Sequence, residues 1–486
     1  MIARASRAAE LGVRGAPRWL TDGAWVVAAK ALATGIVLAA GFTALSDDDF
    51  ARVVIAQRFA EAPSLDPSGT SWLPLPFWIY GAALFTFGST LGVAGATAIV
   101  LGFVSALLVA VAGRFLGLGR LGTCVGASLA ALFPYSALLG AATVPEAPTA
   151  ALIVLGASTL RHHDWRRWAG AGALFMACAS RYEAWPAAVA FAALSALDAW
   201  KQRSRVLAAT ALGALAFPAL WIAHGVVRHG DALFFVSRVS AYRAALGAEP
   251  GGVLELLRAP WALLTTELEL TLLASALCAT LAALGRASEL RRFTRFGFVL
   301  LSILVFLIWG DARGSAPTHH GERALLALWL GMALVAGFAL ERCVAAPRAR
   351  LATIAAPALV VAALLGFALR PQRAPEAFGA RRAEVEIGER ARARGISRLA
   401  IDAPDFGFFA VQAAFGRPSA TRVLDDRDPR RPRAPDRLAS APESLAVELR
   451  AQGIRWLALP RERAALLGTV ARLRDGNADW VLIEFE

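Results

Sequence analysis

Three consecutive aspartates, Asp47, Asp48 and Asp49, follow the first long apolar stretch of the sequence, in the segment LSDDDFARVVIAQRFA. Adjacent carboxylates repel one another, so such a cluster is usually retained because it binds a cation, accepts a proton or caps a helix. Ser46 or Asp47 could simply cap a helix over residues 50–61. A cap would explain one aspartate, and not three.

Further ionisable residues stand beside the ends of later apolar segments. Charged side chains beside long apolar segments are costly to bury unless they pair with each other or face a polar cavity, so these residues are candidates for a functional site. A purely structural ion-pair network, for example Glu146 with Arg181, is the alternative interpretation. The residues are Glu146, Arg181, Glu183, Asp311, Arg313, His319, His320, Glu322 and Arg323.

The adjacent histidines His319 and His320 could ligate a metal, but no third ligand with matching spacing accompanies them. Two neighbouring histidines on a loop are more often simply polar. In the segment 227–260, Arg238, Tyr242 and Arg243 could bind an acceptor or a lipid headgroup, or could only decorate an amphipathic surface helix.

The composition excludes an ordinary soluble protein, because 57% of the 486 residues are hydrophobic and only 18% are charged. The mean hydropathy is +0.53, and lipid must be the solvent for most of such a chain. The net charge of +13 would suggest nucleic acid as a partner of a soluble protein. Here the basic residues stand in short gaps between apolar runs, so they indicate membrane orientation and no nucleic-acid partner.

The sequence therefore predicts an α-helical polytopic membrane protein with about 11 transmembrane helices. Several of the apolar segments are shorter than the ~20 residues that a straight crossing needs, so their ends are approximate. The expected spans are 24–45, 90–113, 121–141, 146–160, 166–180, 184–199, 206–226, 261–284, 296–310, 323–340 and 351–370.

Arginine and lysine placement gives the orientation, since basic residues concentrate in short cytoplasmic segments. With the N-terminus in the cytoplasm, the inner segments hold 19 basic residues and the longer outer segments before residue 370 hold 9. The apolar stretch Leu73–Gly88 opens with prolines and would reverse this alternation if it crossed the membrane. We expect it to lie at the outer interface, within a first outer loop over residues 46–89.

After Arg370 the sequence becomes polar and rich in arginine. Three short apolar runs, RLAIDA, RWLALP and WVLIEF, predict strands, and residues 443–452 and 461–474 have helical patterns. We expect a transmembrane domain over residues 1–370 and a small extracytoplasmic α/β domain over residues 371–486. The segment DDRDPRRPRAPDR at 425–437 is expected to be a mobile loop.

The order and common sidedness of these motifs resemble the GT-C membrane glycosyltransferases, especially the protein O-mannosyltransferase and aminoarabinose-transferase-like group. The resemblance rests on an acidic pair in the first outer loop, the proline-rich segment WLPLPFWIYGAALFTFG, and an acidic residue after the third span, Glu146. It also rests on a basic residue after the fifth span, Arg181, and on Arg323 in ERALLALWLG, which opens a late span.

The resemblance implies an enzyme of the cell (inner) membrane that moves a sugar from a polyprenyl-phosphate carrier to a protein, lipid or glycan acceptor on the outer face. An aspartate of the first-loop pair would be the general base and act with inversion at the anomeric carbon. Arg181 and Arg323 match the family's basic positions, which suit contact with the lipid phosphate. Glu183 and His320 join them as substrate-binding candidates, and no cofactor is certain.

Glu146 matches the second acidic position, which implies contact with the acceptor or, together with Asp48, with a divalent cation. The family often has Asp-Glu and His-Pro-Pro patterns, whereas this chain has three aspartates and WLPLP without a histidine. If the family's acidic pair is matched by its spacing to the IAQR run, the pair is Asp48 and Asp49. If it is matched by its distance from the end of the first span, the pair is Asp47 and Asp48. Asp48 is common to both alignments and is the predicted base.

A secondary transporter or lipid flippase without glycosyl transfer is the competing class, because it would also carry intramembrane charges. Transporters typically have inverted repeats and a polar site at the midplane. This sequence has no matching halves, and its polar residues gather at one face. A non-catalytic membrane scaffold would give no reason for the aspartate cluster.

Overall fold

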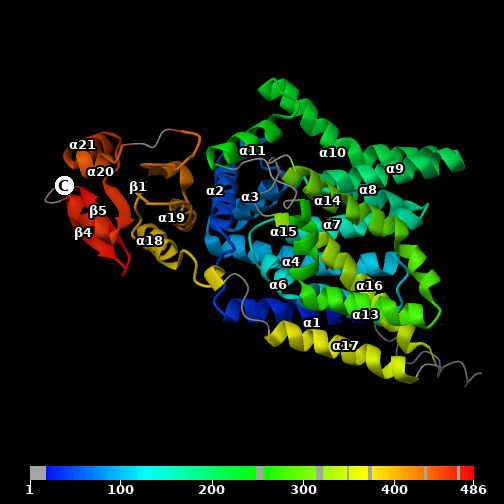
Figure 1. Ribbon diagram of the computed structural model, residues 1–486. Coiled ribbons are helices and arrows are strands. Elements are labelled where there is room, and N and C mark those ends of the chain that lie inside the picture. The colour runs from blue at the N-terminus through cyan, green and yellow to red at the C-terminus, as the bar shows by residue number, and fades with distance from the viewer. Residues whose placement is uncertain are drawn as a thin grey trace, which may run out of the picture.

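The computed structural model describes residues 18–247, 256–312, 321–346, 350–369, 375–431, 435–467 and 471–485. Helices make up most of it, and a five-stranded sheet lies near the C-terminus. Figure 1 shows a large helical body and, to one side, a smaller α/β part that holds the sheet. The predicted helical fold with a small C-terminal sheet is confirmed, while the exact domain limits at 370 and 371 stay a prediction.

Every predicted span coincides with a helix or with a broken pair of helices. The helices of the body are α1 (Arg18–Ala39), α2 (Asp47–Glu61), α3 (Leu75–Phe87), α4 (Leu91–Phe115), α5 (Arg120–Leu132), α6 (Pro134–Leu139), α7 (Glu146–Ser158), α8 (Trp165–Cys178), α9 (Ala184–Gln202), α10 (Arg205–His229), α11 (Phe234–Ala245), α12 (Arg258–Thr265), α13 (Leu268–Ala283), α14 (Thr294–Ala312), α15 (Gly321–Ala324), α16 (Leu326–Val344) and α17 (Arg350–Leu369). Short 3₁₀ turns follow α7 at Thr159–Arg161 and precede α14 at Ala287–Phe293.

Four helices of the described residues are long and apolar enough to cross a membrane: Leu91–Phe115, Arg205–His229, Ala287–Ala312 and Gly321–Val344. The pair α12 and α13 passes the same test together but is bent by 79°. The other candidates are shorter, so the number of eleven spans stays a prediction.

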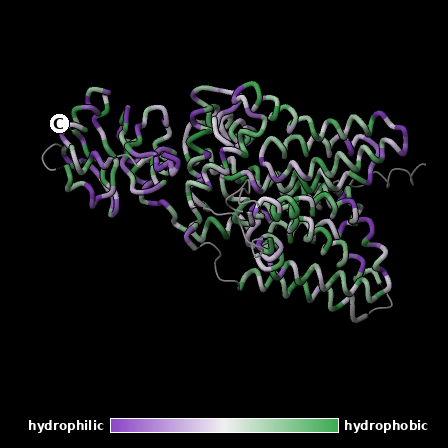
Figure 2. Tube along the Cα trace, turned by 45° about the horizontal axis from the view of Figure 1, so that its top comes forward, coloured by the Kyte–Doolittle hydropathy of each residue, from purple (hydrophilic) through white to green (hydrophobic). Residues whose placement is uncertain are grey.

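Large apolar side chains are exposed around the body, as expected where lipid is the solvent. Leu212, Val227 and Ile354, on α10 and α17, are 70%, 88% and 72% exposed. Figure 2 shows that hydrophobic residues predominate along the helices of the body. The chain is therefore a membrane protein.

The spans expected over 121–141 and 261–284 are each divided between two helices. The span expected over 121–141 divides into α5 and α6 at Pro134, because proline lacks the N–H that a helix interior requires. The span expected over 261–284 divides at the bend between α12 and α13. Glu267 at this bend is fully buried and accepts a hydrogen bond from the Tyr135 N–H at 3.1 Å.

The C-terminal part alternates helices with strands. Its elements are α18 (Arg382–Ala393), β1 (Leu399–Ile401), α19 (Phe408–Phe415), β2 (Thr421–Val423), α20 (Arg437–Ser440), α21 (Pro442–Ala451), β3 (Trp456–Pro460), β4 (Ala471–Gly476) and β5 (Trp480–Phe485), with 3₁₀ turns at Pro375–Ala377, Pro418–Ala420 and Arg461–Leu467. The strand order is β2-β1-β3-β5-β4. β1 pairs in parallel with β2 and β3, and β5 pairs antiparallel with β3 and β4, with Ala458 opposite Leu482.

The three predicted strands and the helix over 443–452 are confirmed, but the helix predicted over 461–474 is wrong. A 3₁₀ turn ends at Leu467, and β4 begins at Ala471 as an edge strand. The physical reason is the hairpin turn that follows, where the Asn477 carboxamide oxygen accepts the N–H groups of Asp479 and Trp480. Within the segment expected to be a mobile loop, the described residues 425–431 form neither helix nor strand.

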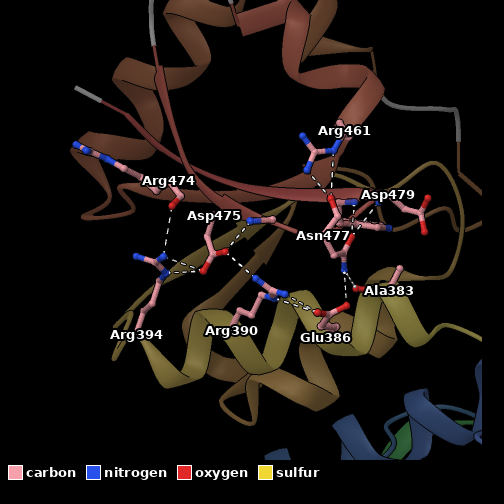
Figure 3. Close-up of polar contacts among 11 residues, drawn as sticks. Ala383, Glu386, Arg390, Arg394, Arg461, Arg474, Asp475, Asn477 and Asp479 are labelled. Atoms are coloured by element: carbon pink, nitrogen blue, oxygen red, sulfur yellow. Dashed lines mark hydrogen bonds and ion pairs between the residues drawn. The ribbon is translucent and has the colours of Figure 1, made fainter.

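Figure 3 shows the polar contacts that join α18 to the β4–β5 hairpin. Asp475 accepts from Arg390 Nη1 and from Arg394 Nε, each at 2.8 Å. Asn477 Nδ2 donates to the Ala383 carbonyl at 2.9 Å. These contacts fix α18 against the β4–β5 hairpin.

The C-terminal part packs directly on α2, the helix that begins with the three aspartates. Gln57 Nε2 donates to the carbonyl of Ala413 in α19 at 2.8 Å, in a buried contact. Ala410 and Ala413 are fully buried and share a hydrophobic cluster with Val53 and Val54 of α2. α2 is thus held between α19 on one side and α3, which packs on it within the same cluster, on the other.

We expect Ala413→Leu to destabilise this interface, because added methylenes in a packed core cost about 1–3 kcal/mol. The measurement is thermal unfolding of the purified protein together with protease sensitivity near residue 375. Ala393→Leu, at an exposed position of α18, is the matched control and should be neutral. Equal stability of both variants would contradict the packing of α19 on α2.

Candidate functional site

The start of α2, which carries the three aspartates, is fixed by its N-cap. Ser46 has an extended backbone, with φ of −168°, and is the N-cap of the helix. A capping box is present, in which the Ser46 side chain accepts the Asp49 N–H and the Asp49 carboxylate accepts the Ser46 N–H. The capping role foreseen for Ser46 or Asp47 therefore belongs to Ser46, and the helix starts at Asp47 instead of residue 50.

Asp49 has a structural role. Its Oδ2 accepts the N–H groups of Leu45 and Ser46 at 3.1 and 3.2 Å, and its Oδ1 accepts Thr143 N–H and Oγ1–H at 3.1 and 3.2 Å. The side chain is 3% exposed. Burial raises the pKa of Asp49 to about 6, although the charge of Arg323 acts in the opposite direction. Asp49 therefore ties α2 to the segment before α7, and both of its oxygens are occupied.

Asp47 is paired with the C-terminal part of the chain. Arg381 donates from Nε to Oδ1 at 2.8 Å and from Nη2 to Oδ2 at 2.9 Å, a bidentate pair. The same guanidinium contacts Glu384 at 3.0 Å and Asp405 at 2.8 Å. The hydrogen bond with Asp47 is the main reason that the pKa of Arg381 lies above its usual value.

Asp48 differs from both neighbours, because no hydrogen bond or ion pair within the described part of the chain engages its carboxylate. The side chain is partly exposed. Its negative charge acts on Arg52 of the same helix, on Arg181 between α8 and α9, and on Tyr242 of α11. Asp48 is thus the aspartate that is available for chemistry.

The predicted residues Glu146, Arg181 and Arg323 meet beside this helix start. Glu146 Oε1 accepts from Arg181 Nη1 at 2.6 Å and lies 3.9 Å from Arg323 Nη1. Arg323 Nη2 donates to Ser46 Oγ at 3.1 Å, and Arg181 Nε contacts Glu183 Oε1. The foreseen Glu146–Arg181 ion pair exists, and Arg323 connects it to the aspartate cluster.

This cluster is buried: Glu146, Glu183, Arg181 and Arg323 are between 3% and 9% exposed. Removing such charges from water is expensive, so each requires a close partner of opposite sign. Burial alone would lower the pKa of Arg181, but Glu146 and Glu183 together raise it above its usual value. Arg181 therefore stays charged and holds Glu146 in place.

A second charged cluster, at the opposite ends of α8 and α9, provides a contrast. Arg167 Nη2 donates to Asp198 Oδ2 at 3.0 Å, and Arg295 donates to both oxygens of Asp198 at 2.7 and 2.9 Å. Arg167 further donates to Ser195 Oγ at 2.9 Å. Both oxygens of Asp198 are occupied, which is typical of a structural network.

His320, proposed as a substrate-binding residue, lies outside the described residues, as do His319 and Arg313. Within the described ranges, no group of three or more His, Cys, Asp or Glu side chains is arranged to hold a metal ion. A divalent cation at Asp48 and Glu146 therefore stays a prediction.

Three residues at the site, Arg52, Thr143 and Arg381, are not predicted from the sequence. Arg52 stands four residues after Asp48, so both lie on one face of α2, and this spacing could have indicated it. Arg381 is separated from Asp47 by 334 positions, and no local pattern connects them.

Comparison with known proteins gives a fold but no close relative by sequence. No family model matches the chain, and no curated protein matches it. Apo ArnT from Cupriavidus metallidurans matches with a TM-score of 0.60 and 12% identity, over 93% of this chain and 97% of that chain. The chain has the fold of ArnT. ArnT from the same organism bound to undecaprenyl phosphate matches with a TM-score of 0.60 and 14% identity, over 95% of this chain and 98% of that chain.

The similarity to ArnT covers the helical body and the C-terminal part together. The resemblance to the GT-C group that the motifs indicated is therefore confirmed at the level of the fold.

We expect Asp49→Asn to destabilise the protein by about 1–3 kcal/mol, because an amide cannot accept all four hydrogen bonds. Folding raises the pKa of Asp49 from 3.8 to about 6, so the folded state binds this proton more tightly than the unfolded state. The stability that this tighter binding contributes is fully present below pH ~4 and is lost as the pH rises through ~6.

The measurement is the free energy of unfolding between pH 4 and pH 7. The wild type should lose stability across this range, and Asp49→Asn should lose less. A variant with the same pH dependence and the same stability as the wild type would show that Asp49 is not the structural carboxylate described above. Glu61→Gln, at an exposed position of the same helix, is the control.

Proposed function

We propose that this protein is an inverting glycosyltransferase that moves a sugar from a polyprenyl-phosphate donor to an acceptor at the outer face of the membrane. The observation that carries the proposal is the different use of the three aspartates. Asp47 is paired with Arg381 and Asp49 is committed to the fold, whereas Asp48 has no hydrogen bond or ion pair among the described residues. A general base needs such an available carboxylate beside the substrate.

In the proposed reaction, Asp48 accepts the proton of the acceptor hydroxyl or amine while its oxygen or nitrogen attacks the anomeric carbon. A bond forms from the acceptor to that carbon on the face opposite the donor phosphate. The bond between the anomeric carbon and the phosphate oxygen breaks, and the phosphate leaves with the electron pair. Positive charge near the leaving phosphate lowers the barrier.

Arg323 is the better placed of the two proposed phosphate ligands. Its guanidinium donates to the neutral Ser46 hydroxyl, and Glu146 lies 3.9 Å away. Arg181 is committed to Glu146 and Glu183. We therefore assign phosphate contact chiefly to Arg323, while Arg181 keeps Glu146 oriented and adds positive charge. His320 stays a proposed substrate-binding residue.

The proposed orientation places the N-terminus in the cytoplasm and the C-terminal part outside. The site residues come from the start of α2, the start of α7, the connection of α8 to α9, and α15. Contacts among them place these ends together at one side of the helical body. The number of basic residues in the connections at the opposite ends supports a cytoplasmic location for that side. Neither the sugar nor the acceptor follows from these contacts.

Asp48→Asn should lower turnover by about 10²- to 10⁴-fold with little effect on donor binding, because a base acts on the acceptor proton. The assay is sugar transfer from undecaprenyl-phosphate-linked mannose, glucose or aminoarabinose by purified protein, with binding of the same donor measured in parallel. Glu61→Gln is the control on the same helix. Full transfer by Asp48→Asn would mean that another group is the base.

Arg323→Gln should instead weaken donor binding, because a partly desolvated phosphate loses a charge-assisted contact worth about 1.5–3 kcal/mol. This loss corresponds to about tenfold to a hundredfold in the dissociation constant. The measurement is binding of undecaprenyl phosphate to the folded variant. Unchanged binding, combined with lower turnover, would assign Arg323 to the reaction step and not to phosphate contact.

A reporter enzyme that is active only outside the cytoplasm should be active when it is fused after Glu486. The same fusion with a reporter that is active only in the cytoplasm should be silent. The opposite pair of results would reverse the orientation and place the proposed site on the cytoplasmic face.

A further inference from the structure

Arg52 is a buried cation without an acceptor. Its side chain is 8% exposed, and no hydrogen bond or ion pair joins it to another described residue. Its Nε is fully buried with no partner. An arginine carries five donors, and a buried donor left unpaired costs free energy, so such a group in a native protein requires an explanation.

The position of this guanidinium is nevertheless fixed. Its Cζ lies 4.4 Å from the ring centroid of Trp72 and 5.9 Å from that of Phe77. The two rings stack with centroids 6.1 Å apart. The start of α3 and the residues before it therefore support Arg52 through cation–π contact, which leaves the donors at the edge of the guanidinium available.

Glu146 presents a matching unpaired acceptor. Its Oε1 is held by Arg181, whereas its Oε2 is fully buried with no hydrogen-bond partner. Glu146 lies beside the start of the helix that carries Arg52, because Arg323 contacts both Ser46 at 3.1 Å and Glu146 at 3.9 Å. Arg52 and Glu146 form no ion pair, so each of these two buried groups of opposite charge keeps an unpaired polar atom.

We propose that Arg52 and Glu146 form a binding slot for hydroxyl groups of the transferred sugar, which rests on the function proposed above. A hydroxyl can accept from the guanidinium and donate to Oε2 at the same time, and so can two adjacent hydroxyls of a sugar ring. The bound hydroxyls then satisfy both unpaired groups. Asp48 lies one helical turn from Arg52 on the same face of α2, so a sugar held in this slot lies beside the proposed base.

A phosphate is a poorer occupant of the same slot. It would accept from Arg52, but its negative oxygens would face the Glu146 carboxylate, which also accepts and carries the same charge. An ammonium group could donate to Glu146, but its positive charge would face the Arg52 guanidinium, which carries the same charge and also only donates. A neutral group that both donates and accepts is the chemistry that completes this pair.

The test compares two lipids, undecaprenyl phosphate and the same lipid carrying a sugar, with mannose, glucose and aminoarabinose each tried as that sugar. Binding is measured on the full-length protein in detergent for the wild type, Arg52→Gln and Arg52→Lys. Arg58→Gln is the matched control, because Arg58 lies on the exposed face of the same helix. Thermal unfolding shows first that each variant is folded.

We expect Arg52→Gln to bind the sugar-bearing lipid about tenfold to a hundredfold more weakly than the wild type, the loss typical of a charge-assisted contact. Its affinity for sugar-free undecaprenyl phosphate should be unchanged. Arg52→Lys retains the charge but loses the forked donors, so it should show a smaller loss confined to the sugar-bearing lipid. Arg58→Gln should match the wild type with both lipids.

An equal loss with both lipids would overturn the proposal and make Arg52 a phosphate ligand or a structural residue. Unchanged binding of both lipids by both Arg52 variants would show that no sugar enters the slot. If neither Arg52 variant folds, Glu146→Gln takes their place, and it must weaken binding of the sugar-bearing lipid relative to binding of the sugar-free lipid. A wild-type protein that binds no sugar-bearing lipid and transfers no sugar would refute the proposed function itself, which is a different result from any of these.

Discussion

The hydrogen bond from Arg323 to Ser46, together with the proximity of Arg323 to Glu146, is the contact that organises the site. It joins α15 and the start of α7 to the N-cap of α2. These helix ends bring several buried charges together, and buried charges are tolerated only when they compensate one another. The starts of α2 and α7 are therefore held by electrostatic contacts as well as by apolar packing.

Because of this constraint, three chemically identical side chains have three different environments. Asp49 faces inward and completes the capping box, and Asp47 faces the C-terminal part and meets Arg381. Asp48 remains between them without a hydrogen bond or ion pair among the described residues, and its charge acts on Arg52 and Arg181. Arg381 also neutralises the carboxylate next to Asp48, and α19 packs along α2. The C-terminal part is thus a component of the site, and the helical body does not form the site alone.

The sequence predicted the helices well because apolar runs bounded by arginines are strong local signals. The distribution of basic residues among the connections also predicted that Glu146, Arg181 and Arg323 lie on the same side of the membrane. The sequence could not assign the three aspartates separately, since their partners Thr143 and Arg381 are distant in the chain. The edge strand β4 was missed because its arginine-rich pattern resembles a solvated helix, and only the Asn477 turn reveals the hairpin.

The most direct test of the account is a structure of this protein with undecaprenyl phosphate bound. We predict that the phosphate lies within hydrogen-bond distance of Arg323 and on the same side of α2 as the Asp48 carboxylate. The isoprenoid chain should run along the apolar surface of the helical body. A phosphate bound at the opposite ends of the helices, for example beside Arg167 and Arg295, would contradict the placement of the site and the role of Asp48 together.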